Sequence, residues 1–203
     1  MKLYYLPGAC PLATHIVLEW IGKPYELHKM AREQLKNPDF LALNPIGSVP
    51  VLVDGDFVLT QSSAILEYLA DLNPEADLLP QNVQQRADVR RWLAFCNADL
   101  HRNFALIFGV QGYVQNPDGQ QQLIDAITAR LLTLFNVVNT QLEGKRWVAG
   151  TRSLVDPYLY TLLRWARAKD IDLSAMENLQ SFYARIEADS GVQAALKEEG
   201  LSV

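Results

Sequence analysis

The chain has 203 residues, of which 49% are hydrophobic and 20% charged, a composition typical of folded globular proteins. Its net charge of −5 disfavours nonspecific binding to nucleic acid or to anionic membranes, so we expect neither partner. The first residues lack the sustained apolar stretch of a signal peptide, and no later segment approaches the roughly 18 uninterrupted apolar residues of a membrane span. Cys10 and Cys96 are too few for a disulfide framework and have no zinc-motif spacing. We therefore expect a cytoplasmic protein, without a metal, that binds a small partner.

The first 30 residues predict a strand, a helix and a second strand. Residues 2–6 read as a strand, and Cys10-Pro11 opens a helix whose apolar residues recur at helical spacing. Proline is favoured at the first helical position, which places Cys10 at or near the N-cap. Residues 25–30 predict the second strand, and residues 31–39 predict a polar loop that leads to a short helical turn.

The following elements predict the end of one domain and the start of another. Residues 51–59 form a β-hairpin around Asp54-Gly55, and a helix begins at Ser62, which completes a βαβ-ββα order. We expect an α/β N-terminal domain over residues 1–78, a linker over 79–84, and an all-α C-terminal domain over 85–203.

Two short motifs in the first domain suit a peptide-like ligand. Pro50 cannot donate to a sheet ladder, so it marks a strand start or edge and leaves the backbone of Val49 free to pair with an extended ligand. Gln61 and Ser62 lie where a helix begins, and the free backbone N–H groups at that point can bind a carboxylate. The alternative is that Pro50 only starts a strand and Ser62 is an ordinary N-cap.

The order of these motifs resembles the glutathione site in the thioredoxin-like domain of cytosolic glutathione transferases. The segment from Met1 to Leu18 closely resembles the bacterial beta class, which carries a cysteine at the position of Cys10. This resemblance implies the glutathione transferase fold, a homodimer, and glutathione as a co-substrate with no metal. It also implies a cis peptide bond before Pro50.

Cys10 has a chemical and a structural interpretation. A thiol at a helix N-terminus titrates below the usual value of about 8.5, so Cys10 can be a thiolate at neutral pH. The structural alternative is a small buried hydrophobic residue, which is the interpretation we give Cys96. Because Ala13 replaces the second cysteine of a Cys-x-x-Cys motif, Cys10 can pair only with a thiol from outside, such as glutathione.

The second catalytic residue comes from the resemblance alone. Residues 92–101 resemble the beta-class helix whose histidine lies beside the glutathione sulfur, which makes His101 a cation or hydrogen-bond donor that stabilises a thiolate. Structural roles are expected for His15 and His28. Ala94 stands where some relatives have a polar ligand residue.

The resemblance also implies the remaining contacts. Val49 would pair with the cysteinyl part of glutathione, and Gln61 and Ser62 would hold its γ-glutamyl end. The expected glutathione contacts are Cys10, Lys36, Val49, Pro50, Gln61, Ser62, Asp99 and His101. The expected hydrophobic substrate contacts are Phe104, Phe108, Tyr113 and Trp165.

We therefore expect a glutathione S-transferase that conjugates glutathione to a small hydrophobic electrophile, with thiol-disulfide exchange through Cys10 as a further activity. One alternative is a glutathione-dependent reductase or dehalogenase. Another is a non-enzymatic binding or regulatory protein on the same fold.

Overall fold

The first half of the chain contains four strands and three α-helices, in a computed structural model that describes residues 1–202. These elements are β1 (Lys2–Tyr5), α1 (Pro11–Ile21), β2 (Glu26–Lys29), α2 (Pro38–Leu43), β3 (Val51–Asp54), β4 (Phe57–Thr60) and α3 (Ser62–Leu72). The strands form one sheet in the order β2-β1-β3-β4. β1 is parallel to β2 and antiparallel to β3, and β3 is antiparallel to β4, which confirms the predicted βαβ-ββα order.

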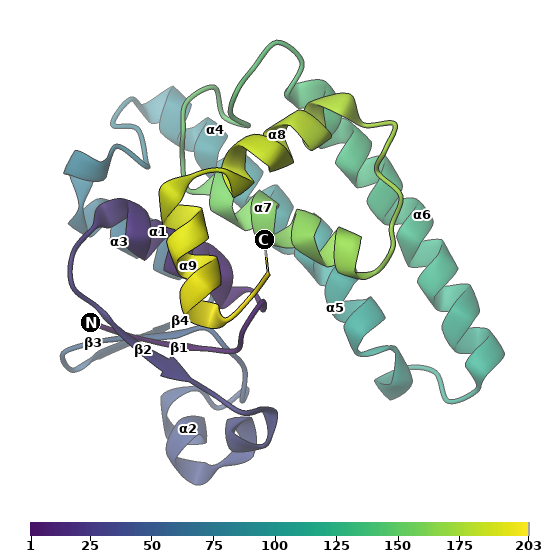
Figure 1. The fold of residues 1–203 in the computed structure, drawn as a ribbon. Coiled ribbons are helices and arrows are strands. Elements are labelled where there is room, and N and C mark those ends of the chain that lie inside the picture. The colour runs from purple at the N-terminus through teal and green to yellow at the C-terminus, as the bar shows by residue number, and fades with distance from the viewer. Residues whose placement is uncertain (203) are drawn as a thin grey trace.

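Helices cover both faces of this sheet (Figure 1). α1 and α3 lie on the face that meets the second half of the chain, and α2 lies on the opposite face. Phe40 of α2 packs there with Met30 and Val51 in a small separate core. The segment predicted as a polar loop contains a 3₁₀ turn, Arg32–Lys36, before α2.

The second half is helical throughout its described residues, as predicted. Its elements are α4 (Val83–Ala94), a π-helical segment (Phe95–His101), α5 (Arg102–Phe108), α6 (Pro117–Gln141), α7 (Val155–Ala168), α8 (Glu177–Glu187) and α9 (Ser190–Glu199). α9 returns to the first half and packs along α1 (Figure 1).

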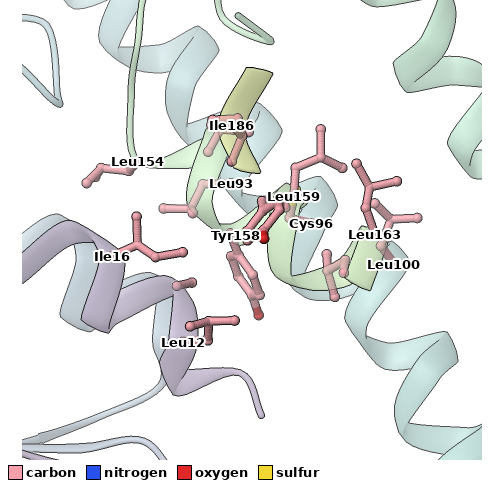
Figure 2. Packing of buried hydrophobic residues seen from close by; sticks show 14 of the residues in the cluster. Leu12, Ile16, Leu93, Cys96, Leu100, Leu154, Tyr158, Leu159, Leu163 and Ile186 are labelled. Atoms are coloured by element: carbon pink, nitrogen blue, oxygen red, sulfur yellow. The ribbon is translucent and has the colours of Figure 1, made fainter. Parts of the chain in front are cut away.

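A single hydrophobic core joins the two halves (Figure 2). Leu12 and Ile16 of α1 belong to the same cluster as Leu93 of α4 and Tyr158 of α7, and all four side chains are at most 1% exposed. Figure 2 shows the Tyr158 side chain reaching from α7 toward α1, close to Leu12. The position of Tyr158 is therefore fixed by packing from both halves.

α7 begins at a fully buried carboxylate. Asp156 accepts hydrogen bonds from the Ser153 backbone N–H at 2.7 Å and from the Val148 backbone N–H at 3.2 Å, and the Ser153 hydroxyl donates to it at 3.3 Å. Burial raises the pKa of Asp156 to about 7. These bonds tie the loop before α7 to the start of the helix that carries Tyr158.

Among the helices that the structure describes, α6 alone is long and apolar enough to cross a membrane by length and composition. The helix also carries Asp125 and Arg130, and the side chains of Leu131, Leu134 and Phe135 are buried in the shared core. Its apolar face thus serves packing within the helical half.

No helix or strand lies between Ala76 and Val83 within the described chain. The expected linker over 79–84 overlaps this segment, and the division into two domains at that point stays a prediction.

Candidate functional site

A pocket of about 170 Å³ opens where the two halves meet. Its lining contains six residues from the first half and two from the second: Cys10, Ser48, Val49, Pro50, Gln61, Ser62, Asn97 and His101. The structure therefore brings together six of the eight predicted glutathione contacts. Lys36 and Asp99 do not line this pocket, and their roles stay predictions.

The loop before β3 is shaped by its own side chains. Asn44 is buried and donates from Nδ2 to the Ser48 carbonyl oxygen at 2.7 Å. Gly47 has φ of 66°, and a Cβ at that position would lie 2.7 Å from the Leu35 carbonyl oxygen, so only glycine fits there without rearrangement. The Val49-Pro50 peptide bond is cis, as the family resemblance implied.

Cys10 caps α1, as predicted, but its ionisation differs from the prediction. Burial raises the pKa of the thiol to about 11, against the smaller lowering effects of the Ser62 side chain and the Cys10 backbone N–H. The thiol donates to the Val49 carbonyl oxygen, with Sγ and O 3.4 Å apart. The expectation of a thiolate at neutral pH is therefore wrong for the ligand-free protein, because loss of water around the sulfur outweighs the helix N-terminus. Cys96 is 1% exposed, which confirms its interpretation as a core residue.

The start of α3 has an unusual backbone. Gln61 precedes the helix with φ of 73°, a region that non-glycine residues rarely occupy and that recurs at functional sites. Ser62 is buried at the first helical position beside Cys10. The first backbone N–H groups of α3 have no partner within the helix and suit an anionic ligand group.

The second half contributes His101 at the end of the π-helical segment. Its Nδ1 lies 2.6 Å from the Tyr158 hydroxyl, which in turn donates to Asn97 Oδ1 at 2.9 Å. Burial lowers the pKa of His101 to about 4. His101 is therefore neutral at neutral pH. Of its two expected roles, the cation is wrong for the ligand-free protein, and the hydrogen-bond donor stays a prediction.

Hydrogen bonds to residues of the helical half fix the turn before Cys10. The Gly8 backbone N–H donates to Glu199 Oε2 at 2.7 Å, and Trp165 Nε1 donates to the Gly8 carbonyl oxygen at 2.8 Å. Glu199 also contacts Nδ1 of the fully buried His15 at 3.1 Å. These bonds position the Cys10 end of α1 relative to the second half.

The predicted hydrophobic substrate contacts differ in exposure. Phe108 is 51% exposed and packs edge-to-face against Trp165, with ring centroids 5.2 Å apart. Trp165 is 8% exposed, so Phe108 offers most of the apolar surface, and the substrate roles of both stay predictions. Phe104 is fully buried behind them, and the prediction that it contacts a substrate is corrected: it supports Phe108 and Trp165 from within the core. Tyr113 is exposed, and it is absent from the described aromatic contacts of this cluster.

Three residues near the pocket were not predicted: Ser48, Asn97 and Tyr158. Asn97 lies three residues after Ala94, the position where some relatives have a polar ligand residue. Because a polar residue one helical turn along can reach the same pocket, Ala94 is the signal that could have pointed to Asn97. Tyr158 lies in an apolar run with Leu159, Leu162 and Leu163, which indicates only a core residue.

Known proteins match over both halves. The family model described as Glutathione S-transferase, N-terminal domain, matches residues 1–71, and the model described as Glutathione S-transferase, C-terminal domain, matches residues 101–189. The chain belongs to the glutathione S-transferase family. It is 45% identical to "Glutathione S-transferase GST-4.5" of Xanthomonas campestris pv. campestris, with all of both chains covered.

Solved structures of this family have the same fold. A glutathione S-transferase from Xylella fastidiosa superposes with a TM-score of 0.96 at 43% identity, covering 99% of each chain. The bacterial beta class enzyme of Sphingomonas chungbukensis gives 0.88 at 34% identity over 100% of each chain. The likeness to beta-class glutathione S-transferases and the predicted fold are thereby confirmed.

Proposed function

We propose that this glutathione S-transferase binds glutathione across the pocket between its two halves and transfers the glutathione sulfur to a small hydrophobic electrophile. The observation that carries this proposal is the composition of the pocket. One side offers backbone groups and the start of α3, and the other offers an imidazole nitrogen without a partner among the described residues. The first side suits a peptide with a carboxylate, and the second suits a thiol.

Binding follows from the first side. The backbone of Val49 pairs with the cysteinyl part of glutathione, and Ser62 and the N-terminus of α3 receive the γ-glutamyl carboxylate, with Gln61 beside it. The sulfur then faces Cys10 and His101. Cys10, with its pKa raised to about 11, is a thiol at neutral pH. When glutathione pairs with the Val49 backbone, the Cys10 S–H turns from the Val49 carbonyl oxygen and donates its single hydrogen bond to the glutathione sulfur.

The reaction removes the thiol proton of glutathione and exchanges the bond between the electrophilic carbon and its leaving group for a bond to sulfur. The glutathione S–H bond breaks as its proton passes to the free nitrogen of His101, and the sulfur electron pair forms a bond to the electrophilic carbon. The leaving group departs with the electron pair of its own bond to that carbon. Phe108 and Trp165 provide apolar surface for the electrophile.

A second candidate activity uses the Cys10 sulfur itself. Cys10 lines the pocket, and no second thiol lines it among the described residues. The Cys10 thiolate would attack the glutathione sulfur of a glutathione-containing disulfide; the substrate S–S bond breaks, the Cys10-glutathione disulfide forms, and the other half leaves as a thiolate. The raised pKa of Cys10 disfavours this activity at neutral pH, because the thiolate is the attacking species.

The proposal includes a cytoplasmic homodimer. β4 and α3 expose apolar side chains at Phe57 (48%), Val58 (37%) and Leu72 (46%), which a second copy would cover. Sedimentation should give twice the mass of one chain, and a monomer at micromolar concentration would reject the dimer.

One assay tests the function. Purified protein is mixed with glutathione and 1-chloro-2,4-dinitrobenzene, and product is followed by absorbance while calorimetry measures glutathione binding. We expect both binding and turnover. Binding without turnover of this or other electrophiles would favour a regulatory protein, and loss of both would reject the glutathione site.

A further inference from the structure

Tyr158 and Asn97 lie beside His101: Asn97 lines the same pocket, and Tyr158 reaches His101 from the core. The Tyr158 hydroxyl is 2.6 Å from His101 Nδ1 and 2.9 Å from Asn97 Oδ1. Asn97 and His101 are four residues apart in the π-helical segment, so their side chains lie on one face and converge on the same hydroxyl. Segments of this kind recur at functional sites.

The proton count fixes the direction of these bonds. A phenol has one proton, and Tyr158 donates it to Asn97 Oδ1, which cannot donate. The Tyr158 oxygen must therefore accept from His101, so the proton of the neutral imidazole is on Nδ1. The lone pair of Nε2 then remains for the pocket that His101 lines.

The surroundings keep this arrangement in place. Tyr158 is fully buried, and burial raises the pKa of its phenol, so it keeps its proton at neutral pH. Trp165 packs its ring edge-on to His101 with centroids 5.0 Å apart, which restricts rotation of the imidazole. Cys10 lines the same pocket as His101, and the Tyr158 hydroxyl bonds His101 directly. Cys96 and Asp99 belong to the segment that carries His101, and the Ser62 hydroxyl faces Tyr158 from α3.

We propose that Tyr158 and Asn97 are positioning residues that hold the His101 imidazole in its Nδ1-protonated form, so that Nε2 accepts the thiol proton of glutathione. This inference rests on the proposed function, in which His101 takes that proton. In this role neither residue accepts the thiol proton itself. Their effect is transmitted through the imidazole, as an orienting group acts on the base in other enzymes.

The two residues also act during the reaction. When the S–H bond breaks and the Nε2–H bond forms, the imidazole becomes a cation with protons on both nitrogens. The hydrogen bond from Nδ1–H to the Tyr158 oxygen then becomes charge-assisted and stronger. Because Tyr158 donates its own proton to Asn97, its oxygen is the better acceptor for that bond.

The decisive readout is which imidazole nitrogen of His101 carries the proton. We would label the histidines of the full chain with ¹⁵N, assign His101 by the loss of its signals in His101→Gln, and record spectra at neutral pH. The wild type should show a protonated Nδ1 and an unprotonated Nε2. Asn97→Ala frees the Tyr158 proton to point at Nδ1, so the proton should move to Nε2, whereas Asn97→Asp keeps an acceptor oxygen and should retain the wild-type pattern.

Kinetics supply the second readout. Tyr158→Phe removes one oxygen from a packed ring and should lower kcat/KM about tenfold while the KM for glutathione changes less than about twofold, because only proton acceptance is impaired. The thiolate absorbance of bound glutathione should also titrate at higher pH in this variant, measured against a sample with S-methylglutathione. The matched control is Tyr160→Phe, since Tyr160 is equally buried on α7 but bonds Glu187 outside the pocket.

The outcomes separate this inference from the proposed function. An Nε2-protonated imidazole in the wild type, or equal kinetics in Tyr158→Phe and Tyr160→Phe, would overturn the positioning role while leaving the transferase intact. A wild type that binds no glutathione and turns over no electrophile would instead remove the proposed function.

Discussion

The two sides of the pocket use different kinds of chemistry. The side from the first half combines the backbone of the Val49-Pro50 segment before β3 and the N-terminus of α3 with the side chains of Cys10 and Ser62. The side from the helical half consists of side chains, with His101 bonded to Tyr158 and Tyr158 to Asn97. In the proposed function the first side holds the ligand, whereas the imidazole of the second accepts a proton.

The two sides of the pocket also give different roles to two thiols, that of Cys10 and that of glutathione. Cys10 belongs to the binding side and keeps its proton, since burial raises its pKa to about 11. The thiol that must ionise is that of glutathione, which would lie opposite the free nitrogen of His101. In the proposed mechanism the nucleophile is therefore part of the ligand, with Cys10 as the donor on one side of it and His101 as the acceptor on the other.

The largest effect should come from the proton-accepting side. His101→Gln removes the base but keeps a side chain that can donate to Tyr158, so we expect kcat/KM to fall by about 10²-fold or more with little change in glutathione affinity. His28→Gln, on the exposed face of β2, is the control. A fall of less than threefold in steady-state turnover would show that His101 does not take the proton.

An intermediate effect is expected on the binding side. Ser62→Ala removes a buried hydroxyl at the start of α3, so the dissociation constant for glutathione should rise about tenfold, because hydrogen bonds to charged groups contribute about 1.5–3 kcal/mol. Turnover at saturating glutathione should change little. Calorimetry would compare the glutathione affinity of Ser62→Ala with that of Ser63→Ala, a control at the neighbouring serine of the same helix. Equal affinities in the two variants would contradict binding of the carboxylate by Ser62.

The smallest effect should be that of Cys10. Cys10→Ala removes one neutral hydrogen-bond donor to the sulfur, so we expect conjugation to fall about fivefold and not to vanish. Because the Cys10 pKa lies near 11, its alkylation by iodoacetamide should be slow at neutral pH and rise about tenfold per pH unit up to that value. Complete loss of turnover in Cys10→Ala, together with a Cys10-glutathione disulfide in the mass spectrum of the wild type, would favour the exchange activity.

The sequence predicted the binding side well, because its signals are local. Three signals each constrain a few neighbouring residues: Pro11 after Cys10, the Val49-Pro50 dipeptide before β3, and Ser62 at a helix start. The structure places all three as expected. Phe108 and Trp165 are also in contact, but the burial of Phe104 depends on how α5 packs, which periodicity does not specify.

The helical side could be predicted only in part. His101 was reached through a family resemblance, and its link to Tyr158 joins residues 57 positions apart in different helices. Tyr158 fits an apolar stripe equally well as a core residue, so nothing local reveals its hydroxyl as a partner. The ionisation of Cys10 and His101 was also missed, because desolvation depends on the whole core and not on the helix end or the neighbouring sequence.

A crystal structure of the wild-type protein with bound glutathione tests the central claim most directly. We predict the γ-glutamyl carboxylate at the N-terminus of α3 beside Ser62, and the sulfur within hydrogen-bonding distance of both Cys10 Sγ and His101 Nε2. A tripeptide bound elsewhere, or a sulfur turned away from His101, would contradict the account.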